Sequence, residues 1–452
     1  MNPNIFREYD IRGRVPEELN RETAYRLGQC FGAYYRRNGA KRVSLGRDCR
    51  LSSPELRQGV LEGMTDAGMD VMDVGMVPTP LLYFSLHHLD VEGGVQITGS
   101  HNPPEYNGFK ICLGKATIYG EEIQKIRKIA ESGVFPKGKG SVETREVIRP
   151  YQEEIEKRIR CGQVARKVVL DAGNGVAGLV APELYMRMGI EVETLFCEPD
   201  GRFPNHHPDP TLPENLKHLV QKVSDTSADL GIAFDGDADR IGVVDRKGRI
   251  LWGDQLMIIF SRDLLKRHPG AKIIGEVKCS QVLYDDIRKN GGVPIMWKAG
   301  HSLIKGKMKE EGALLAGEMS GHLFFAERYF GYDDAIYAGA RLLEILTTEH
   351  KELEDLLAGV PTPVSTPEIR MDCPDDRKFQ IVADLASEFK REYPVIDVDG
   401  ARVAFEGGWG LVRASNTQPV LVLRFEAEDR KTLQKIQTLF MDKLGKKGLK
   451  LT

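Results

Sequence analysis

The chain has few of the features that mark secreted, membrane or nucleic-acid-binding proteins. Its seven cysteines are odd in number and scattered, and none forms a CxxC pair, so neither disulfides nor a zinc site is expected. No apolar run approaches the roughly 20 residues of a membrane helix, and the first residues lack the apolar stretch of a signal peptide. The formal charge of −3 gives no overall field for attracting nucleic acid. We therefore expect a cytoplasmic protein with no nucleic-acid or membrane partner.

The length of 452 residues indicates several domains, because a domain usually holds roughly 100–200 residues. Three stretches of the chain share one order, which is an apolar strand, a helix and a second strand. The strand pairs are 42–46 with 70–74, 167–171 with 191–195, and 272–276 with 293–297. This order, with short glycine-containing turns, predicts a mostly parallel, helix-covered sheet in each stretch.

Each of these three units continues into another apolar strand that ends in a polar loop. The loops are 98–103, 235–240 and 317–322. Because ligands in open α/β sheets bind beyond the carboxyl ends of the strands, we expect the loops to line a site. From about residue 363 the order becomes strand, helix, several strands and helix, which predicts a smaller α+β domain.

The most informative loop holds three aspartates at alternate positions. Asp235, Asp237 and Asp239 would point the same way in an extended loop, and three convergent carboxylates repel one another unless a cation lies among them. Hard oxygen ligands suit Mg²⁺. An EF-hand is excluded, because its glycine and glutamate positions hold Arg240 and Arg246. The alternative is an acidic surface turn.

A candidate nucleophile lies in the first loop. Ser100 is flanked by Gly99 and His101, a setting in which a serine could be activated. An ordinary turn is the competing interpretation, since Ser, Asn and Pro all favour turns. The G-x-S-x-G elbow of acyl hydrolases is not formed, because Asn102 occupies the second glycine position.

The loop before the last strand combines groups that can surround a phosphate. It offers a guanidinium, two hydroxyls and an amide, from Arg413, Ser415, Asn416 and Thr417. A polar hairpin connection is the alternative. The third loop, 317–322, offers a carboxylate, a hydroxyl and an imidazole, which suit sugar hydroxyls but also occur in plain turns.

One further motif indicates a different function class. Residues 173–178 match G-x-G-x-x-G after a strand, with Glu193 near the end of the next strand, as in dinucleotide-binding folds. A dinucleotide-dependent oxidoreductase would leave the three polar loops unexplained. We therefore favour tight helix–strand packing as the reason for these glycines.

Taken in order, the four loops resemble those of the α-D-phosphohexomutase superfamily, and the resemblance covers essentially the whole chain. The segments T-G-S-H-N-P and G-E-M-S-G-H are similar to the bacterial and archaeal phosphomannomutase/phosphoglucomutase group. Phosphoglucosamine mutases are the alternative, but they usually carry Gln where Met319 stands and often Ala where Gly99 stands. The small departures, Ala238 and Gln418, remove no functional group.

The resemblance implies four domains around a central cleft, three of them related α/β units with mixed sheets and the fourth a smaller α+β unit. The expected domains are 1–148 for the phosphoserine, 149–252 for the metal, 253–362 for the sugar and 363–452 for the phosphate. The implied reaction moves a phosphoryl group between the 1- and 6-hydroxyls of mannose or glucose. It would pass through a phosphoserine enzyme and a 1,6-bisphosphohexose, with Mg²⁺ as cofactor and glucose 1,6-bisphosphate as activator.

The resemblance also assigns roles to single residues. The implied metal ligands are Ser100, Asp235, Asp237 and Asp239. The implied catalytic residues are Ser100, which carries the phosphoryl group, and His101, Lys110, Arg240 and His322, which transfer protons or stabilise charge. The implied contacts to the hexose phosphate are Tyr9, Arg12, Lys278, His301, Glu318, Ser320, Arg413, Ser415, Asn416 and Thr417. Lys298 is as well explained as a solvated residue before a turn.

Overall fold

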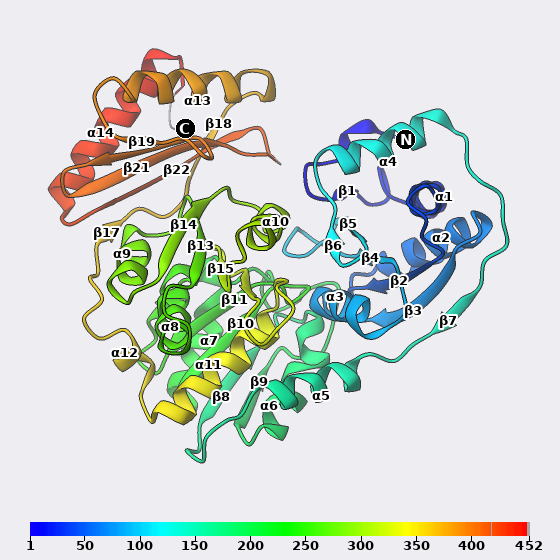
Figure 1. The fold of residues 1–452 in the computed structure, drawn as a ribbon, viewed down its shortest axis with the longest axis horizontal. Helices are drawn as coiled ribbons and strands as arrows, with labels where there is room; N and C mark the ends of the chain where they lie inside the picture. The colour runs from blue at the N-terminus through cyan, green and yellow to red at the C-terminus, as the bar shows by residue number, and fades with distance from the viewer. Residues whose placement is uncertain (417, 450–452) are drawn as a thin grey trace.

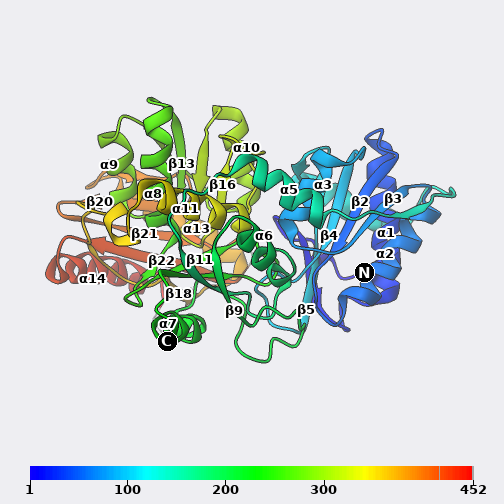
Figure 2. The same ribbon diagram turned by 90° about the horizontal axis from the view of Figure 1, so that it is seen from below.

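The chain folds into four β-sheets that follow one another along the sequence, each with its own helices (Figure 1). The structure is a computed structural model, and it describes residues 1–416 and 418–449. The N-terminal domain stands apart on one side in both ribbon views, and the C-terminal sheet caps the other side (Figures 1 and 2). No helix among the described residues is both long and apolar enough to cross a membrane.

The N-terminal domain is built on a sheet of order β1-β5-β4-β2-β3-β7, with β6 paired to β5. Its strands are β1 (Ile11–Arg14), β2 (Arg42–Arg47), β3 (Asp70–Met76), β4 (Gly93–Ile97), β5 (Tyr106–Leu113), β6 (Ala116–Thr117) and β7 (Val142–Thr144). Its helices are α1 (Arg21–Arg37), α2 (Ser53–Asp66), α3 (Thr79–His88) and α4 (Glu121–Ser132). The helices α1 and α2 pack closely because Gly63 has no side chain; a Cβ there would lie 2.1 Å from the carbonyl oxygen of Tyr25.

The second sheet has the order β12-β11-β10-β8-β9 and the third the order β14-β13-β15-β16. The second unit contains α5 (Ile148–Arg158), β8 (Lys167–Asp171), α6 (Ala181–Arg187), β9 (Glu191–Leu195), α7 (Lys217–Thr226), β10 (Leu230–Phe234), β11 (Ile241–Asp245) and β12 (Ile250–Leu251). The third contains α8 (Gly253–Arg267), β13 (Lys272–Glu276), α9 (Gln281–Lys289), β14 (Val293–Trp297), α10 (His301–Glu311), β15 (Leu315–Gly317), β16 (Leu323–Phe325), α11 (Ala335–Glu349) and α12 (Leu353–Leu356).

The predicted repeat is present in the topology of these three sheets. In each unit a first strand pairs in parallel with the two strands that follow it, and the third strand then pairs antiparallel with a fourth. The four-strand sets are β2, β3, β4 and β5, then β8, β9, β10 and β11, then β13, β14, β15 and β16. The prediction of three related mixed-sheet domains is therefore confirmed.

The C-terminal unit is the predicted α+β domain, an antiparallel sheet with two helices on the side that faces away from the rest of the molecule (Figure 1). Its elements are β17 (Val364–Ser365), β18 (Ile369–Asp372), α13 (Asp375–Phe389), β19 (Val395–Ile396), β20 (Ala401–Phe405), β21 (Gly408–Ala414), β22 (Val420–Ala427) and α14 (Arg430–Lys446). Phe389 and Phe440 stack between the two helices with ring centroids 4.6 Å apart.

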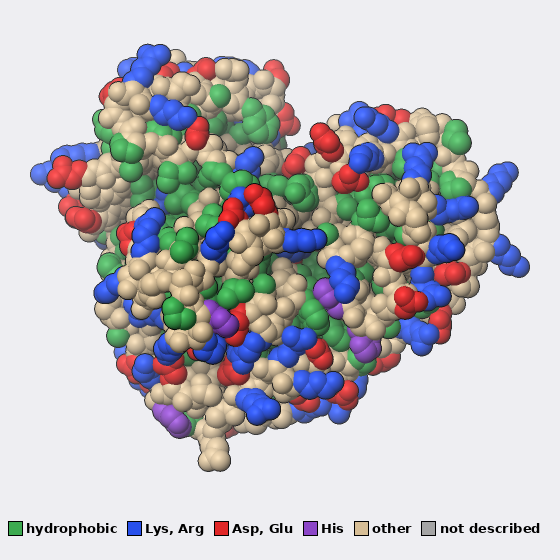
Figure 3. All heavy atoms as spheres, in the orientation of Figure 1, with side chains coloured by type: hydrophobic (Ala, Val, Ile, Leu, Met, Phe, Trp, Pro, Cys, Tyr) green, Lys and Arg blue, Asp and Glu red, His purple; other side chains and the backbone are tan. Residues whose placement is uncertain are grey.

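The hydrophobic cores show how these units are joined. One core runs from α3 of the N-terminal domain through the second and third units, whereas the rest of the N-terminal domain and the C-terminal domain each have their own. A small cluster of Val277, Trp409 and Leu411 joins the third unit to the C-terminal sheet. The surface is notched between the C-terminal and N-terminal domains (Figure 3).

Candidate active site

The polar loops occupy equivalent places in the three related domains. Each joins the third strand of its unit to the antiparallel fourth strand, namely β4 to β5, β10 to β11 and β15 to β16. The C-terminal loop, 415–419, joins the antiparallel strands β21 and β22. Because the fold repeats, loops that look unrelated in sequence are positioned by the same local architecture.

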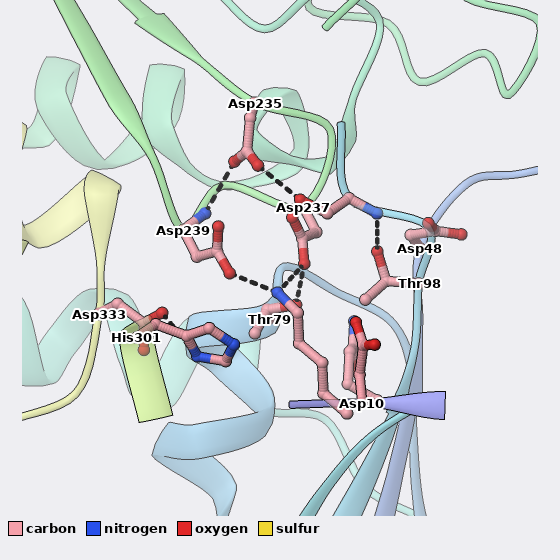
Figure 4. A network of polar contacts seen from close by, with 12 residues as sticks. Asp10, Asp48, Thr79, Thr98, Asp235, Asp237, Asp239, His301 and Asp333 are labelled. Atoms are coloured by element: carbon pink, nitrogen blue, oxygen red, sulfur yellow. Dashed lines mark hydrogen bonds and ion pairs between the residues drawn. The ribbon is translucent and has the colours of Figure 1, made fainter. Parts of the chain in front are cut away.

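The three aspartates of the second loop converge and are fully buried (Figure 4). Ligand oxygens of Asp235, Asp237 and Asp239 all lie within 4.8 Å of one another. The Oδ1 atoms of Asp237 and Asp239 have no hydrogen-bond partner among the described residues. Burial, together with the charges of Asp239 and Asp237, raises the pKa of Asp235 well above its usual range. Unpaired carboxylate oxygens in this arrangement fit a hard divalent cation, and burial excludes the acidic surface turn.

Lys110 on β5 partly offsets this negative charge. Its Nζ donates to Asp237 Oδ2 at 2.7 Å and to Asp239. Burial alone would lower the pKa of Lys110, but the carboxylates of Asp237 and Asp239 raise it. Thr79 at the start of α3 also donates to Asp237 Oδ2, at 2.5 Å (Figure 4). Three carboxylates facing one ammonium still leave a net negative charge for a cation to neutralise.

Ser100 lies directly against this cluster. Its Oγ donates to Asp235 Oδ2 at 2.8 Å and lies 3.0 Å from His101 Nδ1. The backbone of Ser100 is left-handed, with φ of 48°, and its N–H donates to Thr98 Oγ1 at 2.9 Å. Burial and the nearby Arg240 hold the pKa of His101 well below its usual value. The Ser100 hydroxyl is thus held against the carboxylates and beside an imidazole.

A chain of charged groups leads from the second domain into the third. Arg240 Nε donates to His322 Nε2 at 3.0 Å, and His322 Nδ1 lies 3.2 Å from Asp333 Oδ2. Lys305 Nζ donates to Asp333 Oδ1 at 2.8 Å, and His301 Nδ1 lies 3.6 Å from Oδ2 of the same carboxylate. The His301 and His322 rings stack with centroids 5.6 Å apart. Two predicted site residues, His301 and His322, therefore meet around a carboxylate that was not predicted, and Arg240 joins them through His322.

The third loop presents its polar groups beside the start of α10. Glu318 is buried, and its Oε1 accepts from the N–H of Gly300 at 2.7 Å. Ser320, in the same loop, is half-buried. Lys278, at the end of the parallel strand β13, donates to Glu368 Oε2 at 3.2 Å. Burial would lower the pKa of Lys278, but Glu368 and other carboxylates raise it.

The C-terminal loop reaches the first and third domains. Arg413 Nε donates to Asp399 Oδ2 at 2.9 Å, and the same oxygen accepts from the N–H of Ala299 at 3.1 Å. Asn416 Nδ2 donates to the Tyr9 hydroxyl at 2.6 Å, which in turn donates to the carbonyl of Ala299 at 3.2 Å. Burial raises the pKa of Tyr9 to about 12. These contacts bring the predicted phosphate loop against the predicted cleft residue Tyr9.

The remaining predicted residues lie near these groups or outside the described chain. Arg12 Nη1 donates to Asn102 Oδ1 in the Ser100 loop, and its Nη2 donates to Asp10 Oδ2 at 2.5 Å. Ser415 Oγ accepts from the N–H of residue 418 at 3.1 Å. Thr417 lies outside the described residues.

The glycine-rich segment 173–178 has a packing role. A Cβ at Gly178 would lie 1.8 Å from the carbonyl oxygen of Cys197, and one at Gly175 would lie 2.7 Å from that of Gly236. The N–H of Val176 donates to the Gly236 carbonyl at 3.2 Å. The segment therefore supports the aspartate loop, as the packing interpretation predicts.

Several polar residues of the site were missed at the sequence level. They are Asp48, Arg50, Thr79, Lys305, Asp333 and Asp399. Asp48 and Arg50 directly follow β2, so the rule that ligands bind beyond the carboxyl ends of parallel strands could have indicated them. Thr79 and Asp399 are brought in by packing between domains, whereas Lys305 and Asp333 meet the site histidines within the third domain.

Comparison with known families decides the assignment. Sequence profiles of phosphoglucomutase/phosphomannomutase match four successive segments of the chain. The α/β/α domains I, II and III match residues 3–137, 149–248 and 252–364, and the C-terminal domain matches residues 368–443. The chain belongs to the phosphoglucomutase/phosphomannomutase family. The predictions of superfamily and fold class are confirmed.

Similar proteins of this family cover nearly the whole chain. A phosphomannomutase/phosphoglucomutase of Pseudomonas aeruginosa is 50% identical over 442 residues, 98% of this chain and 95% of that protein. A phosphoglucomutase of Neisseria gonorrhoeae is 47% identical over 442 residues, 97% of this chain and 96% of that protein. A phosphoglucomutase/phosphomannomutase family protein of Burkholderia thailandensis has a crystal structure with a TM-score of 0.95 and 45% identity, covering 100% of this chain and 99% of the other.

Enzymes of the phosphoglucomutase/phosphomannomutase family interconvert hexose 1-phosphates and hexose 6-phosphates, and this chain is an enzyme of that class. The prediction of a phosphohexomutase is confirmed. Neither the oxidoreductase nor the phosphoglucosamine mutase alternative is favoured by these relatives.

Proposed function

We propose that this chain interconverts the 1- and 6-phosphates of both glucose and mannose through a phosphoryl group carried on Ser100. The observation that carries the proposal is the 2.8 Å hydrogen bond from Ser100 Oγ to Asp235, which joins a strained, buried serine to the acidic cluster. The Pseudomonas aeruginosa relative, which is named for both sugars, supports the two substrates, whereas the Neisseria gonorrhoeae relative is named for glucose alone. We further propose that 1–148 carries the phosphoserine, 149–252 the metal, 253–362 the sugar and 363–452 the second phosphate.

We assign Mg²⁺ to Asp235, Asp237 and Asp239, with an oxygen of phosphorylated Ser100 completing the site. The orphaned Oδ1 atoms of Asp237 and Asp239 and the all-oxygen ligand set support a hard cation here. When bound, the ion would offset the roughly −1.5 to −2 charge of a phosphoserine and the charge that spreads during transfer. Lys110, paired with two of these aspartates, adds fixed positive charge at the same place.

In the proposed reaction, the free hydroxyl of a hexose phosphate attacks phosphorylated Ser100. The bond from phosphorus to Ser100 Oγ breaks, a bond to the sugar oxygen forms, and the sugar hydroxyl gives up its proton. We assign this proton to His322 Nε2, which accepts from Arg240 Nε in this structure and is freed when the guanidinium turns toward the phosphate. Asp333 Oδ2, 3.2 Å from Nδ1, orients the ring. His101, with Nδ1 3.0 Å from Ser100 Oγ, is placed to exchange a proton with the serine oxygen.

The product of this step is a 1,6-bisphosphohexose, which turns around and returns its other phosphate to Ser100. The groups proposed to hold the phosphate that does not react are Arg413, Ser415, Asn416 and Thr417. Glu318 and Ser320 would bind the sugar hydroxyls, and Tyr9, Arg12, Lys278 and His301 would line the cleft. Glucose 1,6-bisphosphate, as this intermediate, would rephosphorylate Ser100 and so activate the enzyme.

The free thiols of all seven cysteines support a reducing, cytoplasmic location.

The test is a comparison of kcat/KM for glucose 1-phosphate and mannose 1-phosphate, with Mg²⁺ and a trace of glucose 1,6-bisphosphate. Values within about tenfold of each other are expected, because the proposed contacts of Glu318 and Ser320 are to the 3- and 4-hydroxyls. These contacts do not depend on the configuration at C2, where glucose and mannose differ. A preference of more than about a hundredfold for one sugar would refute dual specificity. Higher activity on glucosamine 1-phosphate than on either sugar would refute the substrate assignment.

A further inference from the structure

The guanidinium of Arg50, a fully buried residue in the turn after β2, is bonded to the backbone of the Ser100 loop. Its Nη1 donates to the carbonyls of Pro103 at 2.7 Å and Tyr106 at 2.9 Å. Its Nη2 donates to the carbonyls of Ser100 at 2.8 Å and Asn102. One side chain therefore supplies donors to four carbonyl oxygens of the loop that carries the proposed nucleophile.

Arg50 is itself fixed by groups on its other sides. Asp48 Oδ2 lies 3.3 Å from Arg50 Nε and also accepts from the N–H of Gly99 at 3.1 Å. Asp48 Oδ1 accepts from Ser53 Oγ at 2.5 Å, which anchors the carboxylate at the start of α2. The ring of Phe203, from the second domain, lies 5.2 Å from Arg50 Cζ. The guanidinium is therefore enclosed between the loop, its own domain and the domain that carries the aspartates.

The loop needs such a support because Ser100 adopts a left-handed conformation with φ of 48°. A non-glycine residue keeps this disfavoured conformation only where its surroundings impose it. We propose that Arg50 is a positioning residue for phosphoryl transfer, which holds the left-handed turn so that Ser100 Oγ faces the aspartate cluster. The inference rests on the proposed function, in which Ser100 carries the phosphoryl group.

The chemistry of the contact explains why arginine and glycine stand at these positions. A lysine has three donors on one nitrogen and cannot reproduce a planar fork that reaches four carbonyls. A Cβ at Gly99 would lie 2.3 Å from Arg50 Nε and 2.4 Å from its Cζ, so the alanine that phosphoglucosamine mutases often carry there would require a different position of the guanidinium in this chain. Arg50 bonds backbone oxygens and not Ser100 Oγ, so it acts through the loop.

The test compares Arg50→Lys with Arg166→Lys, a matched loss of a buried guanidinium. Arg166 is 5% exposed and donates to the carbonyl of Lys351 at 2.7 Å, away from the site residues. We expect Arg50→Lys to lower kcat about 100-fold or more, because a misplacement of about 1 Å costs that much. The Kd for glucose 1-phosphate should stay within threefold, and single-turnover transfer from phosphorylated Ser100 should slow by the same factor as kcat. Arg166→Lys should keep kcat per folded enzyme within threefold.

Gly99→Ala tests the same contact from the loop side, and it decides the matter if Arg50→Lys does not fold. It should lower kcat at least tenfold with little change in the Kd for glucose 1-phosphate. A wild-type kcat in either folded variant, or a loss confined to KM, would overturn the inference. Ser100→Ala separates the two claims. An inactive Ser100→Ala beside a fully active Arg50→Lys would overturn only the role of Arg50, whereas an active Ser100→Ala would refute the phosphoenzyme.

Discussion

The hydroxyl of Ser100 donates to Oδ2 of Asp235 at 2.8 Å, although the two residues belong to different domains and lie 135 positions apart. Equivalent loops of two related α/β domains are thus in contact, and each loop contributes a different functional group. The first offers a hydroxyl in a left-handed turn, and the second offers buried carboxylates with unpaired oxygens.

Replacing one carboxylate tests the acidic cluster. We expect Asp235→Asn to lower kcat at least 10²-fold and to weaken Mg²⁺ binding measured by calorimetry, because Asn keeps the shape but removes a ligand charge. Asp245→Asn is the control, since Asp245 is equally buried but bonds the turn after β11. Asp245→Asn should change thermal stability more than kcat. Wild-type kcat and Mg²⁺ affinity in Asp235→Asn would contradict the metal assignment.

The proposed phosphate site of the C-terminal domain is tested by removing the guanidinium of Arg413, at the end of β21. Arg413→Ala should lower kcat/KM by roughly 10- to 150-fold, because a charge-assisted phosphate contact contributes roughly 1.5–3 kcal/mol. Asp399→Asn, which keeps Arg413 but weakens its 2.9 Å anchor, should have a smaller effect in the same direction. Arg391→Ala, an exposed arginine of the same domain, serves as the control and should leave kcat/KM unchanged. Equal kcat/KM in the Arg413 and Arg391 variants would mean that the loop does not bind phosphate.

A buried carboxyl beside the site predicts a pH dependence of stability. Burial raises the pKa of Asp334, the N-cap of α11, to about 7, against about 3.9 in an unfolded chain. The unfolded state therefore ionises first, and stability is lost as pH rises from about 4 to about 7, by up to about 4 kcal/mol. Asp334→Asn cannot ionise, so the Tm of the wild type relative to this variant should fall between pH 4 and pH 8.

Asp429 is the matched control for Asp334, because its ionisation makes stability change with pH in the opposite direction. Asp429 caps α14 at the surface, and a backbone hydrogen bond from Thr432 lowers its pKa. Its contribution is present above the unfolded pKa and is lost as pH falls, so the Tm of the wild type relative to Asp429→Asn should fall toward low pH. A Tm difference between the wild type and Asp334→Asn that does not change with pH would contradict the raised pKa of Asp334.

The glycine-rich segment gives a prediction that separates two function classes. Gly175→Ala should lower kcat about tenfold or more, because the new Cβ would press on the carbonyl of Gly236 in the aspartate loop. Gly445→Ala, in open space on α14, is the control and should leave kcat unchanged and raise Tm slightly. Calorimetry with NAD should show no binding to the wild type. Tight NAD binding abolished by Gly175→Ala would revive the dinucleotide interpretation.

Much of the fold was predictable because parallel strands appear as short runs rich in apolar residues between turn residues. The predicted strands 167–171 and 272–276 coincide with the buried strands β8 and β13, and 191–195 and 293–297 coincide with the partly exposed edge strands β9 and β14. The loops that hold Ser100 and the aspartates were predictable for the same reason, since each directly follows such a run.

The residues that were missed depend on packing between domains or on unusual burial. Asp333 meets His322 only because the segment after β16 folds back on its own loop, and no spacing in the sequence indicates this. Thr79 reaches Asp237 across 158 residues. Arg50 was missed because arginine is mostly a surface residue, and only its four carbonyl partners reveal its place in the site.

The measurement that tests the central claim most directly is a single turnover of the phosphorylated enzyme. The protein would be phosphorylated with isotopically labelled glucose 1,6-bisphosphate and Mg²⁺, freed of small molecules, and mixed with unlabelled glucose 1-phosphate while peptide mapping follows the label on residue 100. We predict one labelled phosphoryl group on Ser100 and its transfer to the sugar at a rate at least equal to kcat, with an unlabelled phosphoryl group from the substrate taking its place. A Ser100 that is never phosphorylated, or a label that stays on residue 100 while product forms, would contradict the account.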